Sequence, residues 1–282
     1  MTILVTGATG TIGSHMVNVL AEKGYRVKAL TRNPHFAHFP EGVEAVKGDL
    51  MDAESLLSAL EGVDAMYLLT SSDQLENDLN TGAEVVRMAE ASGVNKVTLF
   101  TLYGEAQLRT PLKKSSMDWT FVQAVGFMSN ILDDWREIII KGDTVETFYG
   151  DKKTSMIHEK DISEVMVETL INDKHNHQFY TLTGPELISQ IDCLKIIGEQ
   201  IGKQIPVKEM TEKEARNHWR QKGFDEESIE FFVQMSVETP EVGLHVLPTV
   251  REILGKEGRT FEQWAEENKH YFLPEKDGNT NG

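Results

Sequence analysis

The stretch ILVTGATGTIGSHMV, residues 3 to 17, places Gly7, Gly10 and Gly13 between a short apolar run and an amphipathic helical pattern. A strand that enters a helix through such a turn presents backbone N–H groups at the helix N-terminus, where they and the helix dipole attract an anion. A side chain at any of these glycines would obstruct the turn, the approach of a phosphate or the packing of helix on strand. The turn therefore predicts a dinucleotide pyrophosphate site, and a tight turn without a ligand is the alternative.

Short apolar runs alternate with amphipathic stretches through the first half of the chain, which is typical of βαβ units and a parallel sheet. The expected strands are 3–7, 26–32, 43–49, 65–71 and 96–102. The expected helices are 11–24, 53–62 and 76–93. Gly24, Gly62 and Gly93 fall where each helix should end, as left-handed residues do. The pattern predicts an α/β fold with a doubly wound parallel sheet, the Rossmann arrangement.

Two more strands are expected at 120–125 and 179–184, with a helix over 161–173 between them. Capping-box spacing occurs at Asp161 with Glu164, at Thr211 with Glu214 and at Thr260 with Gln263. Beyond Gly184 the pattern is mostly helical, and the last eight residues, 275–282, are expected to fray. We therefore expect the following domains: a dinucleotide-binding core over 1–126, completed by segments within 155–184, and a smaller, mostly helical substrate lobe over 127–154 and 185–282.

Charge and cysteine content exclude several classes of function. The chain has 282 residues and a formal net charge of −17, from 45 acidic residues against 28 Lys and Arg. Nucleic acids and anionic membranes require basic surfaces, so we expect neither as a direct partner. The single cysteine, Cys193, rules out an intramolecular disulfide and a cysteine metal cluster. No basic leader precedes the first apolar stretch, and no run approaches the roughly 20 apolar residues of a membrane span, so a cytoplasmic location is expected.

The end of the second expected strand bears on the choice of dinucleotide. An acid there would bind the ribose hydroxyls and repel a 2′-phosphate, whereas this chain has Thr31 and Arg32. A guanidinium can pair bidentately with a phosphate, so we expect NADP(H) in preference to NAD(H). The alternative is that Arg32 is a solvated residue before a turn. Asp49 is placed to meet the adenine amine, or else to cap the helix that follows it.

The stretches ILVTGATGTIGSHMV, GVEAVKGDLMDAESLLSALEGVDAMYLLT, GFMSN and YTLTGPELIS together resemble the NmrA-like family, atypical short-chain dehydrogenase/reductase relatives that bind NAD(P). The similarity extends over nearly the whole chain. Such relatives include NADPH-dependent quinone and dye reductases, and also redox sensors and transcriptional co-regulators without evident turnover. The expected cofactor contacts are Gly7, Thr9, Gly10, Thr11, Ile12, Gly13, Arg32, Asp49, Leu50, Thr70 and Thr101.

The catalytic residues of the superfamily are only partly present. Its classical members place a Tyr and a Lys four residues apart, and the ammonium lowers the pKa of the phenol. Here Tyr103 is the candidate, but Gln107 stands where the Lys would be. Oxidation of an ordinary alcohol and sugar epimerisation are therefore disfavoured. Reduction of a quinone or conjugated dye requires no catalytic acid from the protein, because the delocalised product anion can take its proton from water. For Tyr103 the alternative is a partly buried aromatic residue without an acid–base role.

Two departures from the family follow the fifth expected strand. The segment YGEAQLRTPLKKSSMD, with Pro111 inside it, is shorter than the usual loop and full helix, which implies either a more open pocket or the loss of that helix. The next strand ends in QAV, where the family commonly has Arg-Pro. On the substrate side we expect Phe127, Met128 and Asn130, because an apolar wall with one amide suits a flat ring; the interior of a helix is the alternative.

The remaining candidates carry less chemistry. His175 and His177 have no metal-ligand spacing and are expected to be solvated loop residues. The aromatic stripe of Trp219, Phe224, Phe231, Phe232 and Met235 is expected to form the core of the lobe, with one or two members facing the substrate as the alternative. The leading hypothesis is an NADP(H)-dependent reductase of a quinone-like or other conjugated molecule. The alternative is a dinucleotide-sensing regulator that acts through a protein partner.

Overall fold

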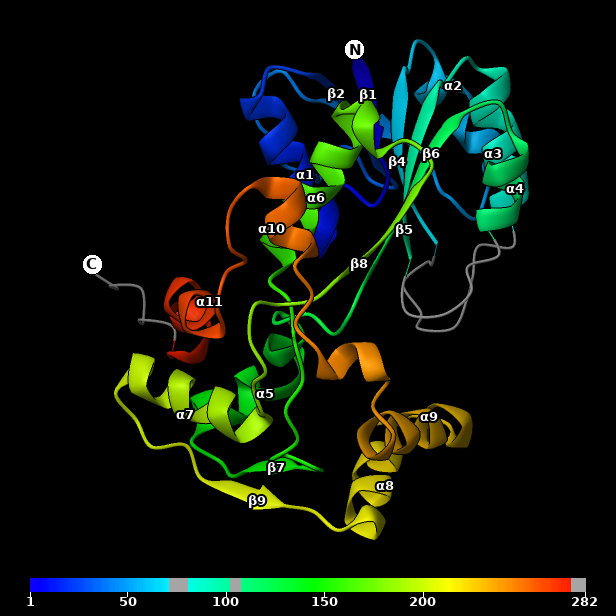
Figure 1. Cartoon of the computed structure of the whole chain (residues 1–282). Coiled ribbons are helices and arrows are strands. Elements are labelled where there is room, and N and C mark those ends of the chain that lie inside the picture. The colour runs from blue at the N-terminus through cyan, green and yellow to red at the C-terminus, as the bar shows by residue number, and fades with distance from the viewer. Residues whose placement is uncertain (71–80, 102–107, 275–282) are drawn as a thin grey trace. The chain divides into compact units, whose positions relative to one another are not determined.

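The computed structural model describes residues 1–70, 81–101 and 108–274, and its chain divides into two units (Figure 1). The first unit comprises Met1–Val125, Glu159–Leu182 and Pro248–Glu257, and the second comprises Gly126–His158, Thr183–Leu247 and Gly258–Gly282. The expected terminal fraying at 275–282 and the first residues of the expected helix 76–93 lie outside the described residues.

A seven-stranded sheet forms the centre of the first unit, and all its paired strands are parallel. The strand order is β3-β2-β1-β4-β5-β6-β8. The strands are β1 (Thr2–Val5), β2 (Arg26–Thr31), β3 (Glu44–Lys47), β4 (Ala65–Leu69), β5 (Lys96–Thr101), β6 (Asp118–Ala124) and β8 (Gln178–Leu182). The central strands are buried on both faces, as the apolar runs predicted.

Helices cover both faces of this sheet (Figure 1). One layer contains α1 (Thr11–Glu22), α6 (Glu159–Ile171) and α10 (Thr249–Leu254). The other contains η1 (Ala53–Leu56), α2 (Leu57–Leu60), α3 (Gly82–Ala91) and α4 (Arg109–Lys114). Leu56, Leu60 and Leu112 of the second layer are fully buried in one hydrophobic cluster with Leu99 and Phe121 of the sheet. The predicted doubly wound Rossmann fold is confirmed.

Three helix ends follow the sequence signals. Gly24, Gly62 and Gly93 adopt φ angles of +78°, +66° and +88°, the left-handed conformation predicted for them. The expected helix 53–62 is present as η1 followed directly by α2.

The predicted cap at Asp161 is wrong. The helix α6 begins at Glu159, two residues earlier, so Asp161 is fully buried within its first turn. Asp161 and Glu164 therefore both lie inside the helix, where neither can serve as its N-cap.

The second unit is mostly helical, with one small parallel pair of strands. Its elements are α5 (Asn130–Lys141), β7 (Val145–Thr147), α7 (Gln190–Ile201), β9 (Val207–Glu209), α8 (Glu212–Gln221), α9 (Glu226–Val237), η3 (Glu241–Leu244), α11 (Phe261–Asn268) and η4 (Lys269–Phe272). The rings of Phe261, Trp264 and Phe272 are completely buried and form its main core with Trp135 and Cys193. The C-terminal helical region is thus a packed body with its own core.

Side chains cap the helices α7, α8, α9 and α11 of this second unit, but not α5. The predicted boxes at Thr211 with Glu214 and at Thr260 with Gln263 are confirmed, and each Thr accepts a hydrogen bond from the N–H three residues on. A third box, Ser189 with Asp192 at the head of α7, was not predicted because Asp replaces the usual Glu or Gln at its third position.

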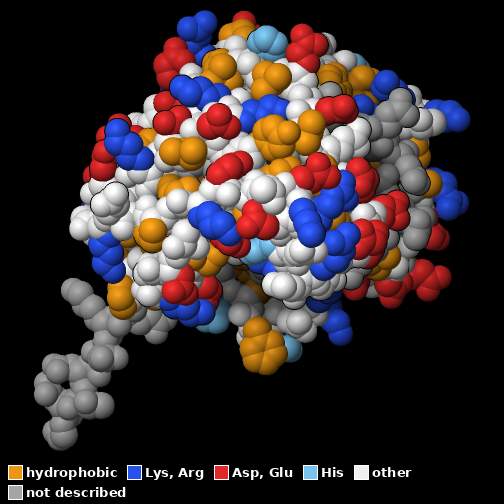
Figure 2. Space-filling view, turned by 90° about the horizontal axis from the view of Figure 1, so that it is seen from below, with side chains coloured by type: hydrophobic (Ala, Val, Ile, Leu, Met, Phe, Trp, Pro, Cys, Tyr) orange, Lys and Arg blue, Asp and Glu red, His pale blue; other side chains and the backbone are white. Residues whose placement is uncertain are grey.

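Charged side chains of both signs are interspersed on the face drawn in Figure 2, with hydrophobic side chains scattered among them. No broad basic patch interrupts the part of that face that the structure describes. This distribution agrees with the net charge of −17.

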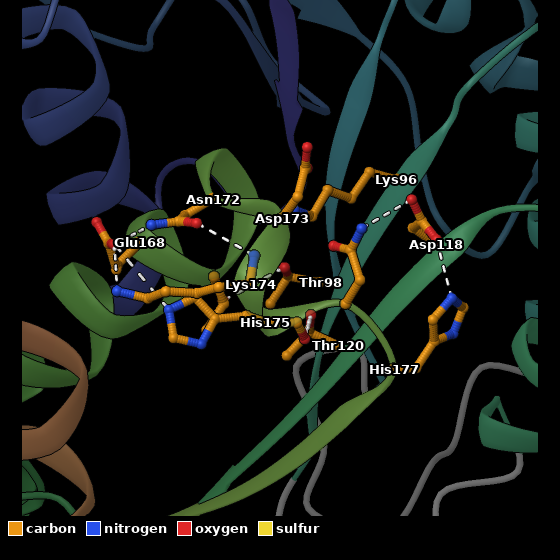
Figure 3. Close-up of polar contacts among 12 residues, drawn as sticks. Lys96, Thr98, Asp118, Thr120, Glu168, Asn172, Asp173, Lys174, His175 and His177 are labelled. Carbon is orange, nitrogen blue, oxygen red and sulfur yellow. Dashed lines mark hydrogen bonds and ion pairs between the residues drawn. The ribbon is translucent and has the colours of Figure 1, made fainter.

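The prediction that His175 is solvated is wrong. The turn η2 (Asp173–His175) after α6 folds back against the sheet, and only 3% of His175 is exposed (Figure 3). Its Nδ1 hydrogen-bonds the Tyr180 hydroxyl at 2.8 Å, while its Nε2 lies 4.0 Å from a carboxylate oxygen of Glu168. By contrast, His177 is more than half exposed and pairs with Asp118 at 2.9 Å.

Burial of His175 makes the stability of the first unit depend on pH. Desolvation lowers the pKa of this imidazole below its usual 6.5, with a smaller contribution from Lys174, and Glu168 opposes the shift only in part. Because the folded state binds its proton less tightly than the unfolded state, stability is full above about pH 6.5 and decreases as the pH falls below it. We expect the free energy of unfolding, measured by urea denaturation, to fall more steeply from pH 7 to 5 in the wild type than in His175→Gln. Identical slopes would contradict this account.

Candidate functional site

The turn between β1 and α1 depends on two glycines. Gly7 has φ +56°, and a Cβ on it would lie 2.4 Å from Cδ2 of Leu69. A Cβ on Gly13 would lie 2.2 Å from the carbonyl oxygen of Gly7, which is backbone and cannot move aside. The N–H of Gly10 donates to that same carbonyl at 2.9 Å. The helix therefore starts directly against the turn, as the glycine spacing predicted.

The N-terminus of α1 carries no side-chain cap. Its N-cap is Gly10, which has extended backbone geometry and no side chain to accept a hydrogen bond. Thr9, Gly10 and Thr11 are exposed, while the side chain of Ile12 is buried and its carbonyl accepts a hydrogen bond from Ser163 at 3.0 Å. The exposed turn and the N–H groups of the first helical turn suit a pyrophosphate. It would occupy the space that side chains would fill if the glycines had them.

A residue that the sequence analysis missed, Thr6, ties this turn to the next strand of the sheet. Its hydroxyl donates to the carbonyl of Tyr67 at 3.0 Å and accepts from the N–H of Leu69 at 3.3 Å. Thr6 is fully buried, and burial also raises the pKa of Tyr67 well above its usual value. A hydroxyl at the end of an apolar strand was the available signal, since such a group needs a partner when it is buried.

The strand order places this turn where open α/β sheets bind ligands. β1 lies between β2 and β4, so the chain leaves β1 toward one side of the sheet and later returns on the other. Ligands bind at the carboxyl ends of the strands at such a switch point. Thr70, which follows β4, is buried at this edge, and Arg32, which follows β2, is exposed. The predicted contacts that follow β1, β2 and β4 therefore all lie at the carboxyl-terminal edge of the sheet in the first unit.

The structure also shows how Asp49 is used. Its side chain accepts a hydrogen bond from the N–H of Met51 at 2.9 Å, and its own N–H donates to the Ser55 hydroxyl at 2.8 Å. The N-cap of η1 is Asp52 rather than Asp49, so the capping alternative is wrong. The neighbouring Leu50 is half-buried against the cluster beneath α2 and α3. Contact of Asp49 with adenine, and of Leu50 with the cofactor, stays a prediction.

A row of polar side chains crosses β5, β6 and β8, where Thr101, Gln123 and Thr181 lie in register. Arg109 of α4 donates to the Thr101 hydroxyl at 3.1 Å and to the Gln123 amide oxygen at 3.3 Å, and the Gln123 amide donates to Thr181 at 2.9 Å. Gln123 is the first residue of the QAV departure. The sequence showed that this position was unusual, but its link to Arg109 was missed.

The segment after β5 retains a helix, α4, although a short one. Pro111 lies in its first turn, where a missing N–H costs no hydrogen bond. The predicted catalytic residue Tyr103, and Gln107 with it, lie outside the described residues.

The predicted substrate residues lie in the second unit. Asn130 is exposed at the start of α5 and Phe127 is half-buried, whereas Met128 is completely buried in the main core of that unit. Met128 is therefore a core residue, but it lies in the turn before α5 and not in the interior of a helix, which was its alternative. Within residues 1–70, 81–101 and 108–274, no group of three or more His, Cys, Asp or Glu side chains could hold a metal ion. No helix in that part of the chain is long and apolar enough to cross a membrane.

A parallel doubly wound sheet with a glycine turn opening onto an uncapped helix at its switch point defines the class of Rossmann-type dinucleotide-binding proteins. Comparison with known families is more specific, because the NmrA-like family model matches residues 1–243. The chain belongs to the NmrA-like family, as its motifs predicted.

Relatives and solved structures resemble this chain over almost its full length. It is 30% identical over 289 residues to a (4-alkanoyl-5-oxo-2,5-dihydrofuran-3-yl)methyl phosphate reductase of Streptomyces griseus, covering 97% of this chain and 100% of that protein. It is also 30% identical over 288 residues to an NAD(P)H azoreductase of Xenophilus azovorans, covering 96% and 99% of the two chains. An NADPH-dependent quinone oxidoreductase of Escherichia coli, solved with NADPH, has the same fold, with a TM-score of 0.76 at 20% identity over 94% of this chain and 99% of that one.

Two alanine substitutions separate the binding role of the turn from its structural role. A methyl group at Gly10 would lie 3.3 Å from the Gly7 carbonyl oxygen, so Gly10→Ala should fold with a small adjustment. It should weaken NADPH binding about tenfold or more, because losing even one charge-assisted hydrogen bond costs about 1.5–3 kcal/mol.

Calorimetric titration with NADPH and urea unfolding measure the two effects. Gly13→Ala is the matched comparison, and it should lower the free energy of unfolding by about 1–3 kcal/mol. Wild-type affinity in folded Gly10→Ala would contradict the site.

Proposed function

We propose that this chain is an NADP(H)-binding oxidoreductase that reduces a quinone-like or other conjugated small molecule by hydride transfer. The observation that carries the proposal is the uncapped glycine turn at the switch point, in a chain that is 30% identical over nearly its full length to two proteins named as reductases. The proposed cofactor is a nicotinamide dinucleotide, with NADP(H) preferred over NAD(H).

The residues of the chain have limited tasks in such a reaction. The bound dinucleotide supplies the hydride, and the backbone N–H groups at the start of α1 hold its pyrophosphate. Catalysis then depends on proximity and orientation, because a conjugated acceptor yields a delocalised anion that water can protonate. This chemistry fits a chain in which Gln107 stands four residues after Tyr103, where a lysine would be needed to make the phenol an effective base.

Arg32 supports the preference for NADP(H). It is exposed directly after β2, at the strand end where a ribose-binding carboxylate would select NAD(H). The three residues Thr31, Arg32 and Asn33 include no acid, and the Thr31 hydroxyl is occupied by the N–H of Asn33 at 3.2 Å. A guanidinium in this position can pair bidentately with the 2′-phosphate.

Reversal of the charge at Arg32 tests this preference. Arg32→Glu should raise the Kd for NADPH about tenfold or more and leave the Kd for NADH within about twofold, since only NADPH carries the 2′-phosphate. The matched control is Arg26→Glu, which reverses an exposed charge at the opposite end of the same strand. Equal effects of the two substitutions on NADPH binding would remove Arg32 from the site.

The reaction itself is tested by following NADPH oxidation, with NADH alongside, against quinones, azo dyes and conjugated carbonyl compounds. We expect turnover with at least one of these acceptors and a higher kcat/KM for NADPH than for NADH. Tight NADPH binding without oxidation across the panel would contradict the enzyme and favour the dinucleotide-sensing regulator.

A further inference from the structure

Tyr149, in the second unit, has an unusual backbone conformation. It directly follows the loop residue Phe148 after β7 and adopts φ +56°; His177 is the other non-glycine residue with positive φ in the described chain. For a side chain with a Cβ this region is unfavourable by about 1–2 kcal/mol. Such conformations persist where surrounding contacts fix them, and they are concentrated at functional sites.

The carboxylate of Glu209 fixes this conformation. Glu209 ends β9 opposite Thr147 of β7, and one of its oxygens accepts a hydrogen bond from the Thr147 hydroxyl at 2.7 Å. The two carboxylate oxygens also accept from the backbone N–H of Tyr149 at 2.6 Å and of Gly150 at 3.2 Å. A Cβ on Gly150 would lie 2.5 Å from the Thr147 hydroxyl oxygen, so the glycine is needed to let the carboxylate approach. The hydrogen bonds from Tyr149 and Gly150 thus hold the backbone on both sides of the Tyr149 side chain, and the Thr147 hydroxyl holds the carboxylate in place.

The ring of Tyr149 stands at one end of a series of aromatic side chains. It meets Phe148 edge-on at 4.8 Å between centroids, and Phe148 meets Trp219 at 5.9 Å. The series continues from Trp219 to Phe232 at 5.4 Å. Phe148 is buried, whereas 43% of Tyr149 is exposed. The stripe expected to form the core of the lobe is therefore buried only in part, since Phe224 and Phe231, both in contact with Phe232, are exposed.

We propose that Tyr149 contacts the acceptor substrate and that its ring stacks on a planar conjugated molecule, an inference that rests on the proposed reductase function. Part of this side chain is free to meet a ligand, because 43% of Tyr149 is exposed and its hydroxyl hydrogen-bonds no described residue. A planar π-system can add a stacked contact to the exposed part of this ring, worth about 0.5–1.5 kcal/mol. Glu209 is a positioning residue that acts through the Tyr149 backbone.

Substitution of Tyr149 by glycine distinguishes the loss of its ring from the relief of its backbone strain. Tyr149→Gly removes the aromatic contact but suits φ +56°, so its urea midpoint should equal or exceed that of the wild type. The KM for menadione, and its Kd in equilibrium dialysis without NADPH, should rise about threefold to tenfold, while kcat stays within about twofold. Tyr149→Asn, which also tolerates positive φ, should behave in the same way, and Tyr149→Phe should retain wild-type KM.

His177→Gly is the matched control, because it relieves the other positive-φ residue in a different unit and should leave the menadione KM and Kd unchanged. Glu209→Ala should raise the KM, and Glu209→Gln, which keeps one of the two acceptor oxygens, should restore it in part. An unchanged menadione Kd in Tyr149→Gly or Tyr149→Asn would overturn the inference. Dialysis keeps this result distinct from a failure of the proposed function, which would appear as wild-type protein that binds NADPH and menadione but transfers no hydride.

Discussion

The close approach of the first turn of α1 to the carbonyl of Gly7 is the constraint on which the site depends. A Cβ on Gly13 would lie 2.2 Å from that oxygen, so the helix can pack against the end of β1 only with glycine at this position. Thr6 then fastens the same turn to β4 through two hydrogen bonds. Because β2 and β4 flank β1, the helix N-terminus is fixed at the point where the strand order reverses.

This arrangement leaves a stabilising interaction unmade in the first unit. Four described helices, α7, α8, α9 and α11, begin with a side chain that accepts a hydrogen bond from the helix backbone, whereas α1, like α3, α4 and α5, has no such cap. A side-chain cap contributes about 1 kcal/mol. A bound anion can take its place, so dinucleotide binding and the stability of this unit are thermodynamically linked.

Local signals in the sequence predicted the fold and the turn, because each depends on residues close in the chain. Glycine spacing, helix stops at Gly24, Gly62 and Gly93, and the capping boxes at Thr211 and Thr260 are all of this kind. The wrong cap at Asp161 and the missed box at Ser189 are local, whereas other errors and omissions involve distant partners. The burial of His175 depends on Tyr180 and the sheet, the polar row depends on Arg109 meeting Gln123, and the strain at Tyr149 depends on Glu209 of another strand.

Hydrogen exchange of the backbone amides, measured with and without NADPH, tests the central claim most directly. The account predicts slower exchange at residues 7–14 and at the segment around Arg32 when NADPH is bound, because the N–H groups at the start of α1 donate to the pyrophosphate. The capped N-termini of α8 and α11 should exchange at the same rate in both states. NADPH binding that leaves the exchange of residues 7–14 unchanged would contradict the account.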